Sequence, residues 1–172
     1  MIRSIKINNK KFKFQLLKNV FEPNLTTILL IKSLNQDLKN KEILELGCGC
    51  GIISKYLLQN KLINRKIFLS DISRSAIKNS KMNLKKFEGK FECKISNLFS
   101  NWEPDKKKFD IIIDDVSAIS QKLKTLSPWF KNTSLASGND GTKLTIEFLK
   151  NAKSFLKKKG SVYFPVLSLS NT

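Results

Sequence analysis

Five polar residues could do chemistry together, because each lies within or shortly after a short apolar run of the sequence: Glu45, Asp71, Asn97, Asp114 and Asp115. If the apolar runs are parallel strands, these residues meet at one edge of a sheet, where such sheets bind ligands. Acidic side chains gathered there suit a ligand that carries hydroxyl groups and positive charge. A single acid could equally end a strand or form a turn, but four together favour a binding site.

A glycine-rich turn, Gly47-Cys48-Gly49-Cys50-Gly51, follows the first of these runs. Glycines permit a tight turn and let a ligand approach the backbone closely. A dinucleotide-binding fingerprint, G-x-G-x-x-G, would need glycine at the position of Ile52. The observed register, G-x-G-x-G, makes a nicotinamide-dependent dehydrogenase the weaker alternative, although Asp71 could bind a ribose diol in either kind of enzyme.

The composition excludes several kinds of chemistry and leaves the role of the charge open. No histidine is present, so Ser-His-Asp catalysis, Cys-His catalysis and histidine-ligated zinc are excluded. The formal charge is +18 over 172 residues, which favours attraction to nucleic acid or the ribosome. Only three of the cations are arginine, so base-specific DNA recognition is not indicated. Codon composition would explain the lysines equally well.

The cysteines indicate a reducing compartment. Cys48, Cys50 and Cys93 are odd in number and form no paired framework, so we expect a cytoplasmic protein. We interpret the first two as small residues that pack within the turn, and we expect no metal site. No apolar stretch reaches the roughly 18 residues of a membrane span, so no membrane partner is predicted.

The periodicity that positions these residues predicts an α/β fold. Alternation over residues 2–16 predicts a β-hairpin, and Asn24 can cap a helix with Leu25, Ile28, Leu29 and Leu34 near one face. Strands and helices then alternate, which indicates a Rossmann-like parallel sheet with helices on both faces. The strands are expected at 43–46, 67–69, 90–95, 111–113 and 162–167, and a last helix at 142–158, stopped by Gly160.

The motifs make the chain resemble the class I S-adenosylmethionine-dependent methyltransferases. Glu45-Leu-Gly-Cys-Gly-Cys-Gly51 looks like their first motif, and Leu69-Ser-Asp-Ile72 like the acidic end of their second strand. The resemblance implies that Gly47 and Gly49 line the methionine part of the cofactor, with Cys48 between them. It also implies that Glu45 orients that region, Asp71 holds the ribose hydroxyls, and Ile72 packs on adenine.

A narrower likeness is to the HemK-like glutamine methyltransferases and the wider small-domain group. Val20-Phe-Glu-Pro23, with Thr27 beyond it, is similar to the segment that closes over the cofactor in those enzymes, and Ser96-Asn-Leu-Phe99 is similar to their Gly-Asp-Leu-Phe. The likeness implies that Thr27, Asn97 and Leu98 lie at the cofactor. Their Asn-Pro-Pro-Tyr signature is replaced by Asp115-Val-Ser-Ala118, so the acceptor atom is not indicated.

The resulting hypothesis is S-adenosylmethionine-dependent methyl transfer to a macromolecular acceptor, a translation-related protein or RNA, in a protein that could be ribosome-associated. Asp115 is the candidate for acting on the acceptor. Asp114 is the alternative, because an error of one residue in the predicted end of the strand would exchange which of the two side chains faces the pocket. A noncatalytic cofactor-binding module remains an alternative. We expect residues 1–20 to be a hairpin extension and 21–172 the methyltransferase domain. Whether the sheet is truncated after its fifth strand, or covered there by the hairpin or a second subunit, stays open, as does the oligomeric state.

Overall fold

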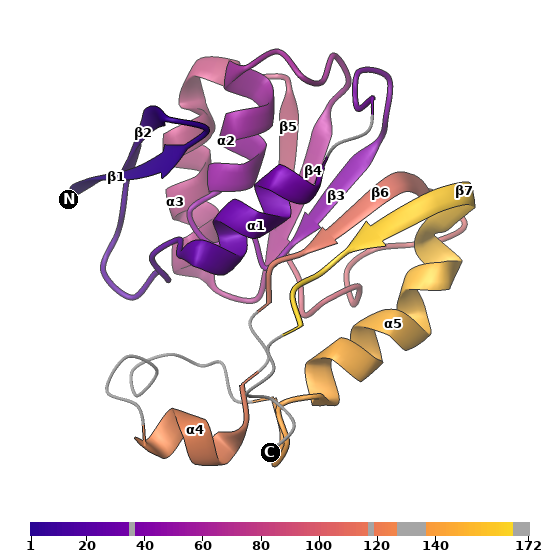
Figure 1. Cartoon of the computed structure of the whole chain (residues 1–172). Coiled ribbons are helices and arrows are strands. Elements are labelled where there is room, and N and C mark those ends of the chain that lie inside the picture. The colour runs from indigo at the N-terminus through magenta and orange to yellow at the C-terminus, as the bar shows by residue number, and fades with distance from the viewer. Residues whose placement is uncertain (35–36, 117–118, 127–136, 167–172) are drawn as a thin grey trace.

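The computed structural model describes residues 1–34, 37–116, 119–126 and 137–166. Its main sheet is parallel, with strand order β5-β4-β3-β6-β7 (Figure 1). The strands of this sheet are β3 (Ile43–Leu46), β4 (Ile67–Asp71), β5 (Phe91–Ile95), β6 (Phe109–Asp114) and β7 (Leu156–Tyr163). The strand order reverses direction at β3, whose last residue, Leu46, pairs with Ser70 on one side and Asp114 on the other. The predicted α/β class is therefore confirmed, and the predicted binding edge lies at this reversal.

Helices cover both faces of the sheet, as the apolar strands require. On one face lie α1 (Leu25–Ser33), α2 (Ile52–Gln59) and α3 (Arg74–Leu84), and on the other lies α5 (Lys143–Phe155) (Figure 1). Alternate strand residues belong to two buried hydrophobic clusters, one on each face of the sheet. Ile43 packs on the face covered by α1 to α3, and Leu44 packs on the face covered by α5. Two short helices, η1 (Lys85–Phe87) and α4 (Gln121–Leu126), complete the helices of the described residues.

The predicted hairpin is present as β1 (Ile2–Ile7) and β2 (Lys10–Gln15). Its two turn residues, Asn8 and Asn9, both have positive φ, as a two-residue type I′ turn requires. The hairpin is fixed to α3 by backbone donors, since Gln15 N–H donates to Asn83 at 2.7 Å. Ile7 belongs to the same buried cluster as Ile43. The division into segments 1–20 and 21–172 stays a prediction.

The predicted buried face of α1 was wrong. Asn24 does cap α1, but Leu25 and Leu29 are exposed, at 67% and 56%. Thr27, Leu30 and Ile31 face the core instead. Apolar residues occur all around this helix, so the pattern alone could not choose its buried face.

The C-terminal boundary also differs from the prediction. Helix α5 ends at Phe155, and Lys157 to Lys159 lie in β7 and not in a last helical turn. Gly160 is inside this strand, where an added Cβ would lie 3.0 Å from the carbonyl oxygen of Phe109. Lys157 Nζ contacts carboxylate oxygens of Glu42 and Asp110 at 2.8 Å each, which stabilises the extended conformation. The fifth strand thus begins earlier than expected and ends at Tyr163, and residue 167 lies outside the described residues.

No helix within the described part of the chain is long and apolar enough to cross a membrane.

Candidate cofactor-binding site

The glycine turn after β3 has a left-handed backbone conformation that favours glycine. Gly47, Gly49 and Gly51 all have positive φ, between +52° and +75°. A Cβ on Gly47 would lie 2.6 Å from Cγ2 of Val116, which follows β6. A Cβ on Gly49 would meet no heavy atom within 4 Å. Gly47 is therefore needed for packing, whereas Gly49 borders open space that a ligand can enter.

Asp71 ties this turn to the end of β4. Its Oδ2 accepts a hydrogen bond from Gly49 N–H at 2.9 Å, and its Oδ1 accepts one from Ser73 N–H at 2.8 Å. Ser73 in turn caps α3 by accepting from Ala76 N–H. Burial raises the pKa of Asp71 despite these two donors. Each oxygen has remaining lone pairs, so the carboxylate can hold the turn and also accept bonds from ligand hydroxyls.

Glu45 is buried beneath the turn, on the face of the sheet that α2 covers. Its Oε2 accepts hydrogen bonds from the backbone N–H of Ser54, at 3.1 Å, and from the Ser54 hydroxyl. Burial raises the pKa of Glu45 to about 8, and the charges of Asp115 and Asp71 add to the shift. The sequence pattern did not reveal Ser54, although a small polar residue among the apolar positions of α2 is a signal for such a partner.

The two acids at the end of β6 lie on opposite faces of the sheet, because successive strand residues alternate. Asp115 is half-buried and accepts a hydrogen bond from Thr27 Oγ1 of α1 at 2.8 Å. Its own N–H donates to Leu46 O, which places it beside the glycine turn. Asp114 is 2% exposed, and its Oδ1 has no hydrogen-bond partner. Burial raises the pKa of Asp114 to about 8 and that of Asp115 to about 7.

The remaining predicted residues surround the same edge from β4 and β5. Ile72 is 63% exposed directly after Asp71, so its apolar side chain can cover a flat ring. Asn97 is exposed, whereas the Leu98 side chain is buried, with a positive φ of 45° at its backbone. Only the backbone of Leu98 is therefore suited to contact a polar ligand.

The two cysteines of the turn are buried free thiols, as expected for packing residues. Cys48 Sγ lies 3.3 Å from Ser80 Oγ, and Ser80 donates to Gly49 O at 2.9 Å. Burial raises the pKa of Cys50 to about 12, so this thiol stays protonated. Ser80 was not singled out from the sequence; it lies on the turn-facing side of α3. Ser117 and Ala118 lie outside the described residues. So does Trp129, an aromatic residue after the fourth predicted strand, which the sequence alone favours as a core residue and offers less strongly as a stacking platform for the substrate.

A parallel sheet with this strand order, a glycine turn after its central strand and an acid ending the next strand define a class I S-adenosylmethionine-dependent methyltransferase. Comparison with known proteins gives the family: residues 11–116 match the model of the methyltransferase small domain, and the chain belongs to that family. It is therefore a methyltransferase that uses S-adenosylmethionine.

Curated relatives agree with this assignment, and a solved structure shares the fold. The chain is 32% identical over 158 residues to a Methanocaldococcus jannaschii protein whose name provisionally assigns it as a protein N5-glutamine methyltransferase, covering 92% of this chain and 77% of that one. It is 36% identical to a bifunctional methyltransferase of Rickettsia prowazekii, over 83% of this chain but only 29% of the relative. A T. thermophilus 16S rRNA methyltransferase solved with AdoMet and guanosine shares the fold, with a TM-score of 0.66 and 16% identity over 95% of this chain and 41% of that one.

The glycine turn gives a first prediction, in which two similar substitutions have different effects. Gly47→Ala should lower the free energy of unfolding by about 2 to 4 kcal/mol, because left-handed strain adds to the contact with Val116. Gly49→Ala should cost only about 1 to 2 kcal/mol, the strain alone, but should weaken cofactor binding. Thermal unfolding and calorimetric titration with S-adenosylmethionine measure the two effects. Equal loss of stability in both variants would contradict the packing argument.

The buried carboxyl of Asp114 gives a second prediction. Its pKa is raised from an ordinary value to about 8 on folding, so between these values the folded protein holds a proton that the unfolded chain releases. The free energy of unfolding of the ligand-free protein should therefore decrease from pH 5 to pH 8. Asp114→Asn should flatten this slope. Chemical denaturation at a series of pH values measures it, and an unchanged slope in the variant would show that Asp114 does not retain the proton.

Proposed function

We propose that this protein transfers the methyl group of S-adenosylmethionine to a macromolecular acceptor, either a translation-related protein or RNA. The observation that carries the proposal is the hydrogen bond between Gly49 N–H and Asp71, which joins the glycine turn to the acid at the end of β4 beside open space. The turn can receive the methionine part of the cofactor along Gly47, Cys48 and Gly49, while Asp71 accepts bonds from the ribose hydroxyls.

The charge of the site suits this cofactor. When bound, S-adenosylmethionine supplies a methyl group on a positively charged sulfur. Burial raises the pKa of Glu45, Asp71 and Asp115, and at Glu45 the charges of the other two acids add to the shift. A cation placed among them would favour their ionised forms and would be stabilised in return. Ile72 would cover the adenine, with Asn97 and the Leu98 backbone at its polar edge.

Asp115 is the residue that we assign to the acceptor. The bond from Thr27 fixes one oxygen of its carboxylate, and the other can accept a hydrogen bond from an acceptor N–H or O–H. Such a contact holds the two reactants in line, which is the main source of acceleration in a displacement at carbon. A proton released by the acceptor could pass to Asp115. Asp114 lies on the opposite face of the sheet, and burial raises its pKa to about 8, so we assign it no contact with the acceptor.

The class of acceptor rests on two observations. The Methanocaldococcus relative is named for a protein glutamine, which supports a protein acceptor. The formal charge of +18 supports an RNA acceptor or association with the ribosome. A cytoplasmic location remains part of the proposal and rests on the unpaired cysteines of the sequence.

The direct test is incubation with methyl-labelled S-adenosylmethionine and a cell lysate, with and without ribonuclease treatment. Label in a single protein or RNA species identifies the acceptor. Calorimetric binding of the cofactor without transfer to any fraction would instead favour a noncatalytic binding module.

Asp71→Ala should weaken binding of S-adenosylmethionine by about 1.5 to 3 kcal/mol, the usual loss when bonds to a charged group are removed. Calorimetric titration measures the change, and a melting curve shows whether the variant is folded at the temperature used. Asp105→Ala is the control, because it removes an exposed carboxylate in the loop before β6. Unchanged affinity in Asp71→Ala would overturn the assignment of this residue to the ribose.

Asp115→Asn and Asp115→Ala should both lower turnover while nearly preserving cofactor affinity, because the acid contacts the acceptor in our assignment. Asn keeps the shape and one acceptor oxygen, so its loss should be the smaller one. Steady-state rates with labelled cofactor at saturation test this. Full activity in Asp115→Ala would transfer the role to Asp114 or away from β6.

A further inference from the structure

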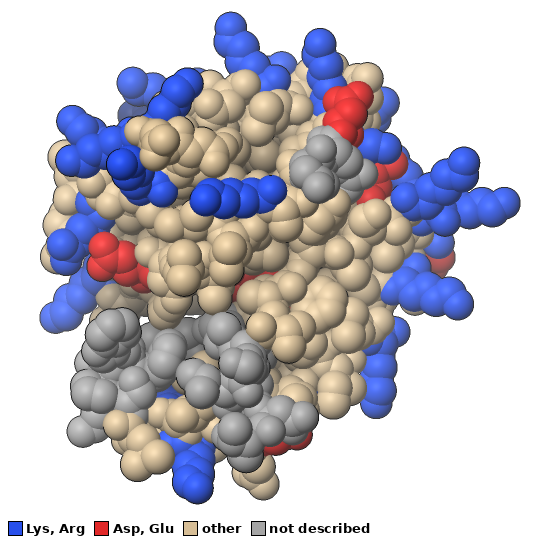
Figure 2. All heavy atoms as spheres, in the orientation of Figure 1, with Lys and Arg blue, Asp and Glu red and all other residues tan. Residues whose placement is uncertain are grey.

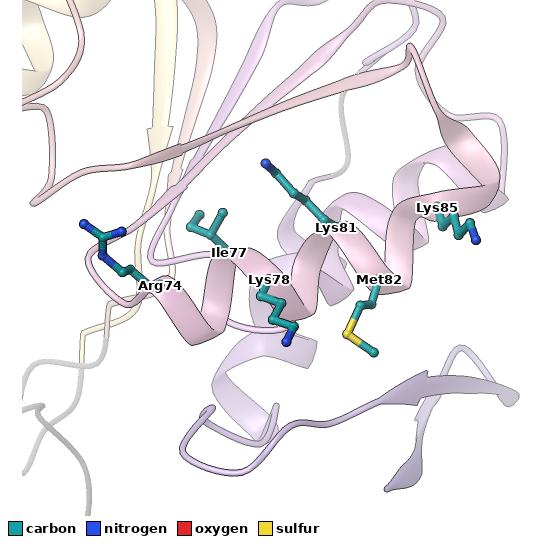
Figure 3. A pocket seen from close by; sticks show the side chains of 6 residues that line it. All are labelled: Arg74, Ile77, Lys78, Lys81, Met82 and Lys85. Atoms are coloured by element: carbon teal, nitrogen blue, oxygen red, sulfur yellow. The ribbon is translucent and has the colours of Figure 1, made fainter.

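Helix α3 and the turn that follows it carry a regular row of cations on their outer side. Arg74, Lys78, Lys81 and Lys85 are separated by four, three and four residues, so with 3.6 residues per turn they form one stripe about 16 Å long. All four side chains are exposed. Figure 3 shows them along the length of the helix, with Arg74 and Lys81 turned to one side of the stripe and Lys78 and Lys85 to the other.

The charges of this row are not neutralised by neighbouring acids. Among the described residues, none of the ion pairs involves any of the four cations. Lys107 and Lys157 differ, because both pair with Glu42. Asp71 precedes Arg74 by three residues, and its two oxygens accept hydrogen bonds from backbone N–H groups, with no ion pair to Arg74.

Apolar groups flank the row. Ile77 and Met82 line the same shallow hollow as the four cations (Figure 3). Met82 is 40% exposed, although its neighbours Asn83 and Leu84 are buried. A surface with an exposed apolar side chain beside a row of cations is suited to a polymer that offers both charge and less polar sugar or base surfaces.

We propose that this outer side of α3 is a binding surface for the sugar-phosphate backbone of RNA. The inference deepens the proposed function, because it names RNA as a macromolecule that the enzyme holds during or before methyl transfer. Lysines act as point charges for phosphates without reading bases, which matches a row with a single arginine. A lipid surface does not fit, because the apolar face of α3 is buried against β4 and β5.

The row begins next to the cofactor edge. Arg74 is the first residue of α3 and follows Ser73, whose N–H is bonded to Asp71. RNA bound along the row would therefore reach the edge of the sheet at which the cofactor is proposed to lie. In Figure 2, Lys and Arg also surround the face that is shown and acids are few on it, so the total charge adds long-range attraction.

The test separates this row from the overall charge by comparing two triple variants of equal charge. The first is Lys78→Gln/Lys81→Gln/Lys85→Gln, and the control is Lys143→Gln/Lys150→Gln/Lys153→Gln, on the exposed side of α5 across the sheet. Binding of a fluorescein-labelled RNA hairpin is measured by anisotropy over a series of salt concentrations. Glutamine has a helix propensity close to that of lysine, so both variants should fold.

The α3 variant should lose about two to three units of the slope of log affinity against log salt and at least about tenfold in affinity near 0.1 M salt. In the α5 control, both the change in slope and the loss of log affinity should be less than one third of those in the α3 variant. Equal losses in the two variants would overturn the proposal, because they would show attraction by net charge alone. If polyglutamate displaced the labelled hairpin as strongly as unlabelled RNA does, the proposal would also be overturned, in favour of an acidic protein partner.

The outcome is independent of the catalytic assignment. If RNA binding depends on the row but Asp71→Ala binds the cofactor normally, the cofactor site is wrong and the RNA surface stands. If cofactor binding behaves as proposed but the two triple variants bind RNA equally, only the present inference fails.

Discussion

The arrangement of the binding edge depends on the tight backbone turn that follows β3, the central strand. At this point the backbone must pass between the ends of β4 and β6, and Cys48 N–H donates to Ser70 O while Asp115 N–H donates to Leu46 O. These two bonds hold the neighbouring strand ends against the turn. Gly47 leaves no space for a Cβ beside Val116. The position of every acid at this edge follows from that tight passage, because each belongs to one of the three strands that meet there.

The buried acids at this edge lower the stability of the folded chain. A carboxylate that is buried without a cationic partner is destabilised, and Glu45, Asp114 and Asp115 respond with raised pKa values. Elsewhere a half-buried acid is paired with cations: Glu42 contacts Lys107, Lys157 and Arg65. Lysines are abundant in this sequence, yet within the described ranges no ion pair involves the acids at this edge. This is consistent with a site whose negative charge is available to a cationic ligand.

The sequence was sufficient for the parallel sheet and its polar edge, because apolar runs followed by glycine or acid indicate strand ends directly. It was not sufficient for contacts between distant residues. The bond from Thr27 to Asp115 joins residues 88 positions apart, and the two ion pairs of Lys157 place it in a strand although a run of lysines suits a helix end. Likewise, Leu25 is exposed because tertiary packing chose the other side of an apolar helix.

Helix α3 connects the two kinds of surface in this molecule. Its inner side carries Asn79 and Asn83, which bind the backbone of the hairpin, and Ser80, which binds the glycine turn. Its N-terminus is fixed through Ser73 to Asp71. The four cations on the outer side make no such hydrogen bonds to the hairpin or the glycine turn, so these positions could vary without affecting the fold. A regular row of unpaired cations on that side is therefore not required by folding, and an external anionic partner gives it a physical reason.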